Sequence, residues 1–147
     1  MDIRIVHSED AHAWERMRQH LWPSPPGEHA RDIAAYLAGD RRNPAAVFLA
    51  CDDDGAAIGF AEVSIRTSAE GCSSDRVAYL EGWFVEEQVR RQGIGALLML
   101  AVEGWGRAEG CTELASDTEL HNDVGAAAHR ALGFDEVERL VCFRKAL

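Results

Sequence analysis

Two glycines near the middle of the chain stand where a backbone could come close to a bound anion. They belong to Arg90-Arg91-Gln92-Gly93-Ile94-Gly95, which follows an apolar run over residues 80–85 and precedes residues that repeat at helical spacing. A helix that begins here offers unpaired N–H groups and the positive end of its dipole. The stretch is therefore a candidate phosphate site.

Three phosphate-binding motifs compete for this stretch. A dinucleotide loop runs Gly-x-Gly-x-x-Gly directly after its strand, but Leu98 stands in place of the third glycine and charged residues intervene over 86–92. A nucleotide-triphosphate loop requires Gly-Lys-Ser/Thr, which is absent. The best match is Arg-x-x-Gly-x-Gly, formed by Arg90, Gly93 and Gly95, and the alternative is a glycine turn that binds nothing.

Two carboxylates stand in segments that are otherwise expected to be buried strands. Glu81 interrupts the apolar run, and an unpaired buried carboxylate is costly, so it has a partner or awaits a cation. The alternative for Glu81 is a structural ion pair with an arginine. Asp117 ends the next expected strand, where catalytic groups often lie in open α/β sheets.

Trp22 is a third candidate, at the end of a helix that Pro23, Pro25 and Pro26 stop. An indole in this place is either a core residue or a platform for a sugar or cyclitol ring. The sequence leaves both interpretations open.

The hydrophobic pattern predicts the elements that position these residues. Strands are expected over residues 2–7, 46–51, 57–66, 76–85, 113–117 and 137–145, and helices over 8–21, 28–38, 94–109 and 122–132. In the strand over 57–66, Glu62, Ser64 and Arg66 indicate a face that is exposed to water. The order of elements predicts an α/β fold in one domain, residues 1–147.

Bulk properties narrow the class of partner. The net charge of −10 argues against nucleic acid and anionic membranes and favours a cationic substrate, although by itself it is explained as well by solubility alone. No apolar run approaches a membrane span and no signal peptide is evident, so a cytoplasmic location is expected. The four cysteines form no Cys-x-x-Cys pair, so no metal site is expected.

The loop motif, its strand and helix, and the order of elements resemble the GCN5-related N-acetyltransferases (GNAT family). Asn122 and Ala131-Leu132-Gly133-Phe134 are similar to that family's second cofactor segment. The resemblance implies a central mixed sheet flanked by helices, with splayed central strands, and acetyl-CoA as co-substrate. It implies that the cofactor is held by Trp83, Phe84, Val85, Arg90, Arg91, Gln92, Gly93, Ile94, Gly95, Ala96 and Asn122.

Five short pieces resemble one branch more closely, the aminoglycoside 6′-N-acetyltransferases of antibiotic resistance. They are Leu21-Trp22-Pro23, Ile58-Gly59-Phe60-Ala61, Leu80-Glu81-Gly82, Ala115-Ser116-Asp117-Thr118 and Glu138-Arg139. The resemblance implies a substrate site made of Trp22, Glu81, Asp117 and Glu138. Convergent carboxylates would bind the ammonium groups of such a drug, and an indole would cover a ring.

The expected reaction is direct attack of a neutral 6′-amine on the acetyl-CoA thioester in a ternary complex. The Val85 N–H would stabilise the oxyanion, and Glu81 or Asp117 would act as the base. Many relatives have a tyrosine that serves the departing thiolate, but this sequence has His129, which could donate a proton or only pack and hydrogen-bond.

Other outcomes are also open. The acceptor could be a polyamine or a protein N-terminus, or the chain could be a regulatory module that binds acetyl-CoA without turnover. Relatives are often dimers, and an exposed final strand could pair across a two-fold axis, so a homodimer is expected.

Overall fold

A five-stranded mixed sheet forms the centre of the molecule. In the computed structural model, which describes residues 1–147, the strands lie in the order β1-β2-β3-β4-β5. All neighbouring pairs are antiparallel except β4 and β5, which are parallel. The bounds are β1 (Asp2–Ile5), β2 (Ala46–Cys51), β3 (Ala57–Arg66), β4 (Val77–Val85) and β5 (Leu114–Ser116).

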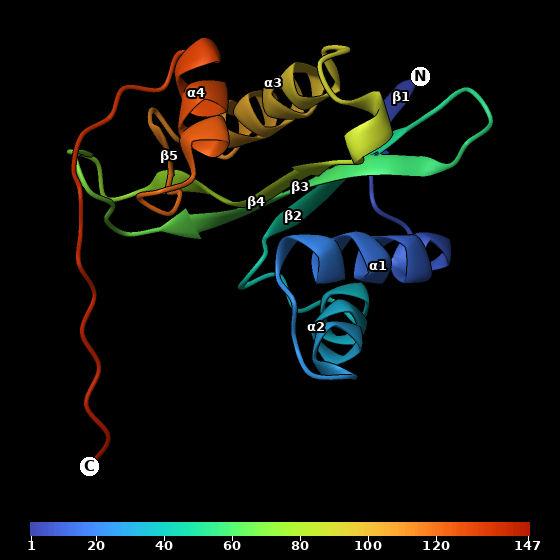
Figure 1. The fold of residues 1–147 in the computed structure, drawn as a ribbon, viewed down its shortest axis with the longest axis horizontal. Coiled ribbons are helices and arrows are strands. Elements are labelled where there is room, and N and C mark those ends of the chain that lie inside the picture. The colour runs from blue at the N-terminus through green and yellow to red at the C-terminus, as the bar shows by residue number, and fades with distance from the viewer.

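Helices cover both faces of the sheet (Figure 1). One face carries α1 (Ala11–Leu21) and α2 (Glu28–Leu37), and the other carries α3 (Ile94–Ala108) and α4 (Asp123–Ala131). Short 3-10 helices, η1 (Ser8–Asp10) and η2 (Glu87–Val89), precede α1 and α3. No helix is long and apolar enough to cross a membrane.

Each face of the sheet has its own hydrophobic core. Leu80, Leu98 and Val102 belong to the core under α3, whereas Trp14 and Phe60 belong to the core under α1 and α2. The sheet is therefore apolar on both sides, and polar side chains can be exposed only at its edges and where strands separate.

A β-bulge in β4 determines which side chains face which core. Glu62 of β3 pairs with Gly82, and the next residue, Val63, pairs with Leu80, so Glu81 is the extra residue. A bulge reverses the alternation of side chains between the faces. Leu80 before it and Trp83 after it consequently both pack toward α3.

The neighbouring strands β4 and β5 separate after Leu80. β5 is only three residues long and pairs with Ala78, Tyr79 and Leu80, while β4 continues to Val85 paired with β3 alone. The predicted fold class, a mixed sheet flanked by helices with splayed central strands, is confirmed.

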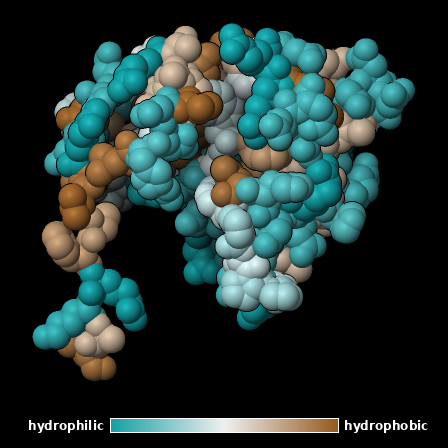
Figure 2. Space-filling model, viewed as in Figure 1, coloured by the Kyte–Doolittle hydropathy of each residue, from teal (hydrophilic) through white to brown (hydrophobic).

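The predicted final strand is wrong. Residues 137–145 form no strand, and the chain after α4 extends away from the body of the molecule (Figure 1). Val141 and Phe143 are 71% and 93% exposed. Figure 2 shows hydrophobic surface along this segment. The physical reason is that strand propensity cannot form a strand without a neighbouring strand, and this segment pairs with none in the single chain.

Candidate active site

The predicted phosphate loop has the backbone that the motif requires, and its two glycines are needed for different reasons. Gly93 precedes α3 with a φ of 84°, and a Cβ there would meet nothing, so the backbone angle alone favours glycine. At Gly95 a Cβ would lie 2.7 Å from the ring of Trp83, so space alone excludes a side chain. No side chain caps α3, which leaves its first N–H groups available to an anion.

The other residues of the loop differ in exposure, and therefore in which of their groups could contact a ligand. Arg91 adopts a left-handed φ of 63°, which is uncommon for a residue with a side chain, and it is exposed together with Gln92. Arg90 donates from Nε to the carbonyl of Val85 at 2.9 Å and so ties the loop to the end of β4. Ile94 is buried in the core, so only its backbone could contact a ligand.

The three residues predicted to line the pantetheine arm do not share one face. Trp83 and Val85 pack toward α3, but Phe84 packs on the opposite core, 6.1 Å from the Phe60 ring. The indole Nε1 of Trp83 is buried without a hydrogen-bond partner. A buried donor of this kind is unusual and is consistent with a ligand acceptor nearby.

His129 links α4 to the end of β5. Its Nδ1 lies 2.7 Å from the carbonyl of Gly125, and its Nε2 lies 2.8 Å from the Oγ of Ser116. A carbonyl can only accept, so Nδ1 carries the proton, and in the neutral ring Nε2 accepts from the Ser116 hydroxyl. The ring packs edge-on against Trp83 at 5.7 Å.

Asn122 caps α4 with both ends of its amide. Oδ1 accepts from the N–H of Gly125 at 2.9 Å, and Nδ2 donates to Thr118 Oγ1 at 3.1 Å. The capping role expected of an asparagine before a helix is present.

The two predicted acids, Glu81 and Asp117, are connected through a tyrosine and an arginine. Arg66 donates from Nε and Nη2 to the two oxygens of Glu81, at 3.2 and 2.8 Å. Its guanidinium lies over the ring of Tyr79, 3.4 Å from the centroid, and the Tyr79 hydroxyl donates to Asp117 Oδ2 at 2.6 Å. The ion pair that was the alternative for Glu81 is thus present, without excluding a role in binding.

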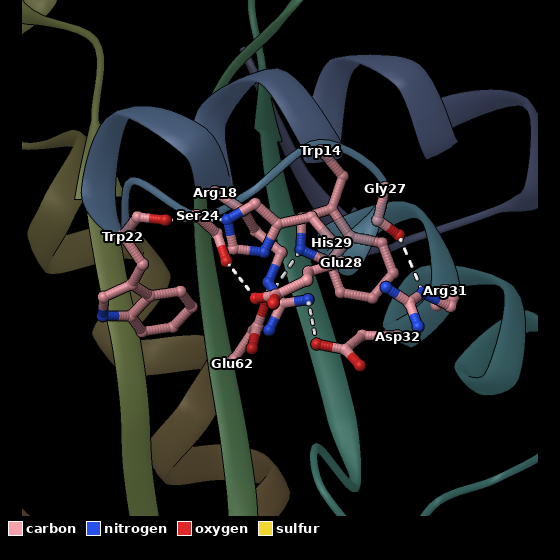
Figure 3. A network of polar contacts seen from close by, with 10 residues as sticks. All are labelled: Trp14, Arg18, Trp22, Ser24, Gly27, Glu28, His29, Arg31, Asp32 and Glu62. Carbon is pink, nitrogen blue, oxygen red and sulfur yellow. Dashed lines mark hydrogen bonds and ion pairs between the residues drawn. The ribbon is translucent and has the colours of Figure 1, made fainter.

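Trp22, at the end of α1, packs against the residue that follows Glu81 in β4. Its ring packs against Gly82, where a Cβ would lie 2.2 Å from the indole, and edge-on against Phe60 at 6.2 Å. His29 Nε2 lies 2.7 Å from the Trp22 carbonyl and holds the backbone (Figure 3). Trp22 is half-buried, so it is both a core residue and a partly open surface.

A buried charged network supports Trp22 from behind (Figure 3). Arg18 lies 5.3 Å from the Trp22 ring centroid, and its Nε is 3.0 Å from Glu62 Oε1. Trp14 donates its indole N–H to the same carboxylate oxygen at 2.8 Å. Burial raises the pKa of Glu62 to about 7, although Arg18 and Trp14 both favour its charged form.

The exposed face predicted for β3 is therefore wrong at two of three positions. Glu62 and Ser64 are each only 2% exposed, and only Arg66 lies at the surface. Packing of α1 over this part of the sheet covers Glu62, whose carboxylate contacts Trp14 and Arg18.

Glu138 stands apart from the other predicted substrate residues. It lies in the exposed segment after α4 and lines, together with Asp117, a hollow of about 550 Å³. Neither Trp22 nor Glu81 lines that hollow. The neighbouring Glu136 is paired with Arg139 and Arg130, which lower its pKa to about 2.

The sequence of the chain matches that of the Acetyltransferase (GNAT) family over residues 14–134. The chain belongs to the GNAT acetyltransferase family. This membership confirms the predicted family and the predicted class of enzyme, an N-acetyltransferase. The splayed strands and the uncapped helix are thus the GNAT scaffold of this chain.

Full-length relatives narrow the comparison within the GNAT family. The chain is 50% identical to aminoglycoside N(6′)-acetyltransferase type 1 of Klebsiella aerogenes, covering 99% of this chain and 96% of that protein. It is 44% identical to the protein of the same name from Stenotrophomonas maltophilia, covering 99% and 93%.

Solved structures agree with this placement. AAC(6′)-Iy, in complex with the bisubstrate analogue CoA-S-monomethyl-acetylneamine, matches with a TM-score of 0.90 and 40% identity over 99% of this chain and 98% of that one. AAC(6′)-IG from Acinetobacter haemolyticus matches with a TM-score of 0.91 and 33% identity over 100% and 99%.

Several residues of this GNAT site were missed by sequence reasoning as parts of the site. Arg66 and Glu62 were assigned only to an exposed face, and Tyr79 and Arg18 were not singled out. One signal was available: Trp14, Arg18 and Trp22 recur every four residues, so they share one side of a helix. The pairing of Arg66 with Glu81 had no comparable signal.

Proposed function

We propose that this GNAT protein is an aminoglycoside 6′-N-acetyltransferase, which transfers acetyl from acetyl-CoA to the 6′-amine and so confers antibiotic resistance. The observation that carries the proposal is the pair of connected acids, Glu81 and Asp117, where β4 and β5 separate, with Trp22 packed against Gly82 next to Glu81. Relatives of that name at 50% and 44% identity support it.

The residues of the loop fit acetyl-CoA, which supplies an acetyl group activated as a thioester. The uncapped N–H groups at the start of α3 suit a pyrophosphate, and Arg90 and Arg91 add positive charge. The buried Trp83 indole N–H, and the edge of β4 that β5 leaves unpaired after Leu80, suit the pantetheine arm. Asn122, at the start of α4, would touch the cofactor from the far side.

The proposed chemistry uses the two acids differently. Arg66 engages both oxygens of Glu81, whereas Tyr79 bonds only one oxygen of Asp117. We therefore assign Asp117 as the base that takes a proton from the ammonium, directly or through water, and Glu81 as a ligand of a substrate ammonium. The backbone N–H of Val85 would stabilise the oxyanion, and alignment of the two substrates supplies much of the rate.

His129 enters the proposal as a residue that positions Ser116. Its Nδ1 donates its proton to the Gly125 carbonyl, and its Nε2 accepts from the Ser116 hydroxyl. The neutral ring therefore has no proton directed at a leaving thiolate. The Ser116 proton is in turn directed at His129, so the departing CoA thiolate takes its proton from water.

Thiol release from acetyl-CoA tests the function directly. Kanamycin, tobramycin, a polyamine and a peptide are offered separately, together with an aminoglycoside whose 6′-amine is replaced by a hydroxyl. Release with the amines and none with the hydroxyl analogue is expected. Release only with the polyamine or the peptide would contradict the drug as substrate, and cofactor binding without release would indicate a regulatory module.

A homodimer in the cytoplasm is part of the proposal. Val141 and Phe143 of the segment after α4 are exposed, and the outer edge of β5 has no neighbouring strand. A second copy could cover both features and direct Glu138 toward the hollow beside Asp117. All four cysteines are free, as is usual in a reducing compartment.

Sedimentation equilibrium tests the dimer. The wild type is expected to sediment as a dimer, and Val141→Asp as a monomer, because a charge would have to be buried in the interface. Val124→Asp is the matched control, since Val124 on α4 is 80% exposed and lies outside this segment. A wild-type monomer, or a dimer that persists in Val141→Asp, would contradict the arrangement.

A further inference from the structure

Arg66 occupies the place beside Glu81 that an amine substrate would need. Its guanidinium makes two parallel hydrogen bonds to the carboxylate, at 3.2 and 2.8 Å, which is the strongest geometry available to such a pair. The Glu81 side chain is 16% exposed and that of Arg66 is 43% exposed. The arginine therefore covers the acid on its solvent side.

The same guanidinium is connected to the second acid. It lies over the Tyr79 ring at 3.4 Å, and the hydroxyl of that ring donates to Asp117. Burial, together with this hydrogen bond, raises the pKa of Tyr79 well above its ordinary value, so the hydroxyl keeps its proton. Arg66 thus contacts the Glu81 carboxylate directly and is linked to the Asp117 carboxylate through Tyr79.

The sheet explains why these side chains meet. Arg66 pairs with Val77, and Ser64 pairs with Tyr79, so Arg66 and Tyr79 are diagonal neighbours on one face. The bulge at Glu81 turns its carboxylate to the same side. The contacts among Arg66, Tyr79 and Glu81 depend on β3 and β4 alone, and Arg66 is the last residue of β3, where the side chain can swing outward.

We propose that Arg66 is a specificity-determining residue that stands in for a substrate ammonium in the free enzyme and releases Glu81 when a polycationic acceptor binds. This inference rests on the proposed function. Each acceptor must displace an internal cation, so binding favours molecules that bring enough positive charge to replace it. The arginine weakens the binding of every aminoglycoside and excludes weakly charged amines.

Steady-state kinetics of Arg66→Ala with kanamycin test the inference. The KM for kanamycin is expected to fall roughly five- to twentyfold, because a half-buried ion pair and a cation–π contact no longer compete, while kcat changes little. Arg66→Lys keeps the charge but loses the planar fork, so an intermediate KM is expected.

Arg107→Ala is the matched control for net charge. Arg107 forms a single-contact ion pair with Glu103 on α3, away from the acids, and its side chain is 71% exposed, so its removal changes the net charge by the same amount without touching the site. Its KM is expected to equal that of the wild type. An unchanged or raised KM in Arg66→Ala would overturn the inference, as would an equal fall in Arg107→Ala.

Spectra of the arginine side chains give a second readout that does not require a variant to be active. In ¹⁵N-arginine-labelled wild type, the Nε–H signal of Arg66, assigned by its loss in Arg66→Lys, is expected to shift on addition of kanamycin but not of acetyl-CoA. A signal unchanged at saturating kanamycin would overturn the inference. No thiol release and no kanamycin binding by the wild type would instead reject the proposed function itself.

Discussion

Two contacts between a glycine and a tryptophan, one on each face of the sheet, show how the two halves of the site differ. Gly95 packs against Trp83 on the α3 side, and Gly82 packs against Trp22 on the α1 side. The first pair belongs to one strand, loop and helix that are consecutive in the chain. The second pair joins the end of α1 to the middle of β4.

The two halves also differ in the partners that their polar groups already have. The loop half, residues 90–96 with Trp83, presents N–H groups at the start of α3 that no side chain caps. The acceptor half has its partners in place: Arg66 covers Glu81, Tyr79 bonds Asp117, and Arg18 supports Trp22. A ligand of the first half fills free groups, whereas a ligand of the second half must exchange with existing ones.

The strongest way to break this comparison is to neutralise the acids of the acceptor half. Glu81→Gln and Asp117→Asn are each expected to reduce kcat/KM for kanamycin about 10²- to 10⁴-fold. Asp117→Asn acts through kcat because the ammonium loses its base, and Glu81→Gln acts through KM because an ammonium loses its ligand. Acetyl-CoA affinity, measured by calorimetry, should stay unchanged. Glu103→Gln on α3 is the control, and unchanged turnover in both site variants would reject the assignment.

The buried network behind Trp22 is tested by the pH dependence of stability. Burial raises the pKa of Glu62 from 4.5 to about 7, so the native state keeps a proton that the unfolded chain releases. The free energy of unfolding of the wild type, relative to Glu62→Gln, should therefore fall by about 3 kcal/mol as pH rises from about 4.5 to about 7.

Urea titrations of both proteins across this pH range measure that difference. A difference that rises with pH instead would mean that Arg18 and Trp14 outweigh burial and hold Glu62 charged.

The two glycines allow the halves to be perturbed one at a time. Gly82→Ala would press a methyl group against Trp22 and should raise the KM for kanamycin about tenfold, with the KM for acetyl-CoA unchanged. Gly95→Ala would press a methyl group against Trp83 and should raise the KM for acetyl-CoA, with the KM for kanamycin unchanged. Initial rates with each substrate varied in turn give both constants.

Gly104→Ala on α3 is the control for both glycine variants. A Cβ there meets nothing, so catalysis should be unchanged and stability raised by about 0.5–1 kcal/mol. If either site variant raised both KM values equally, the two halves would not be separable.

The smallest effect is expected at His129. Because its Nε2 accepts from Ser116, His129→Ala should lower kcat less than tenfold and leave the pH profile of kcat in place. A hundredfold loss together with a missing alkaline limb would show that His129 is itself the proton donor. Ser116→Ala provides the comparison within the same hydrogen bond.

Much of the fold could be predicted because its signals are local. β2 and β3 have the bounds expected from their apolar runs, and prolines stop α1 where predicted. Asn122 caps α4 as expected. The segment over 137–145 was predicted wrongly because its composition favours a strand, but a strand also needs a neighbour that composition does not name.

The candidate site likewise has one part that follows from local sequence and one part that depends on contacts between distant segments. The sequence by itself determined the backbone of the predicted phosphate loop, since Gly93 is required by a backbone angle and the start of α3 follows from its neighbours in the chain. It also identified Glu81, Asp117 and Trp22 as unusual residues.

Only the tertiary structure decided which partners these residues have. Glu81 meets Arg66, and Glu62 is buried against Arg18, because a one-residue bulge sets the register of β3 against β4 and α1 packs over that register. Register is a property of two strands together, and a shift of one residue sends every side chain to the opposite face. No single segment of the sequence contains that information.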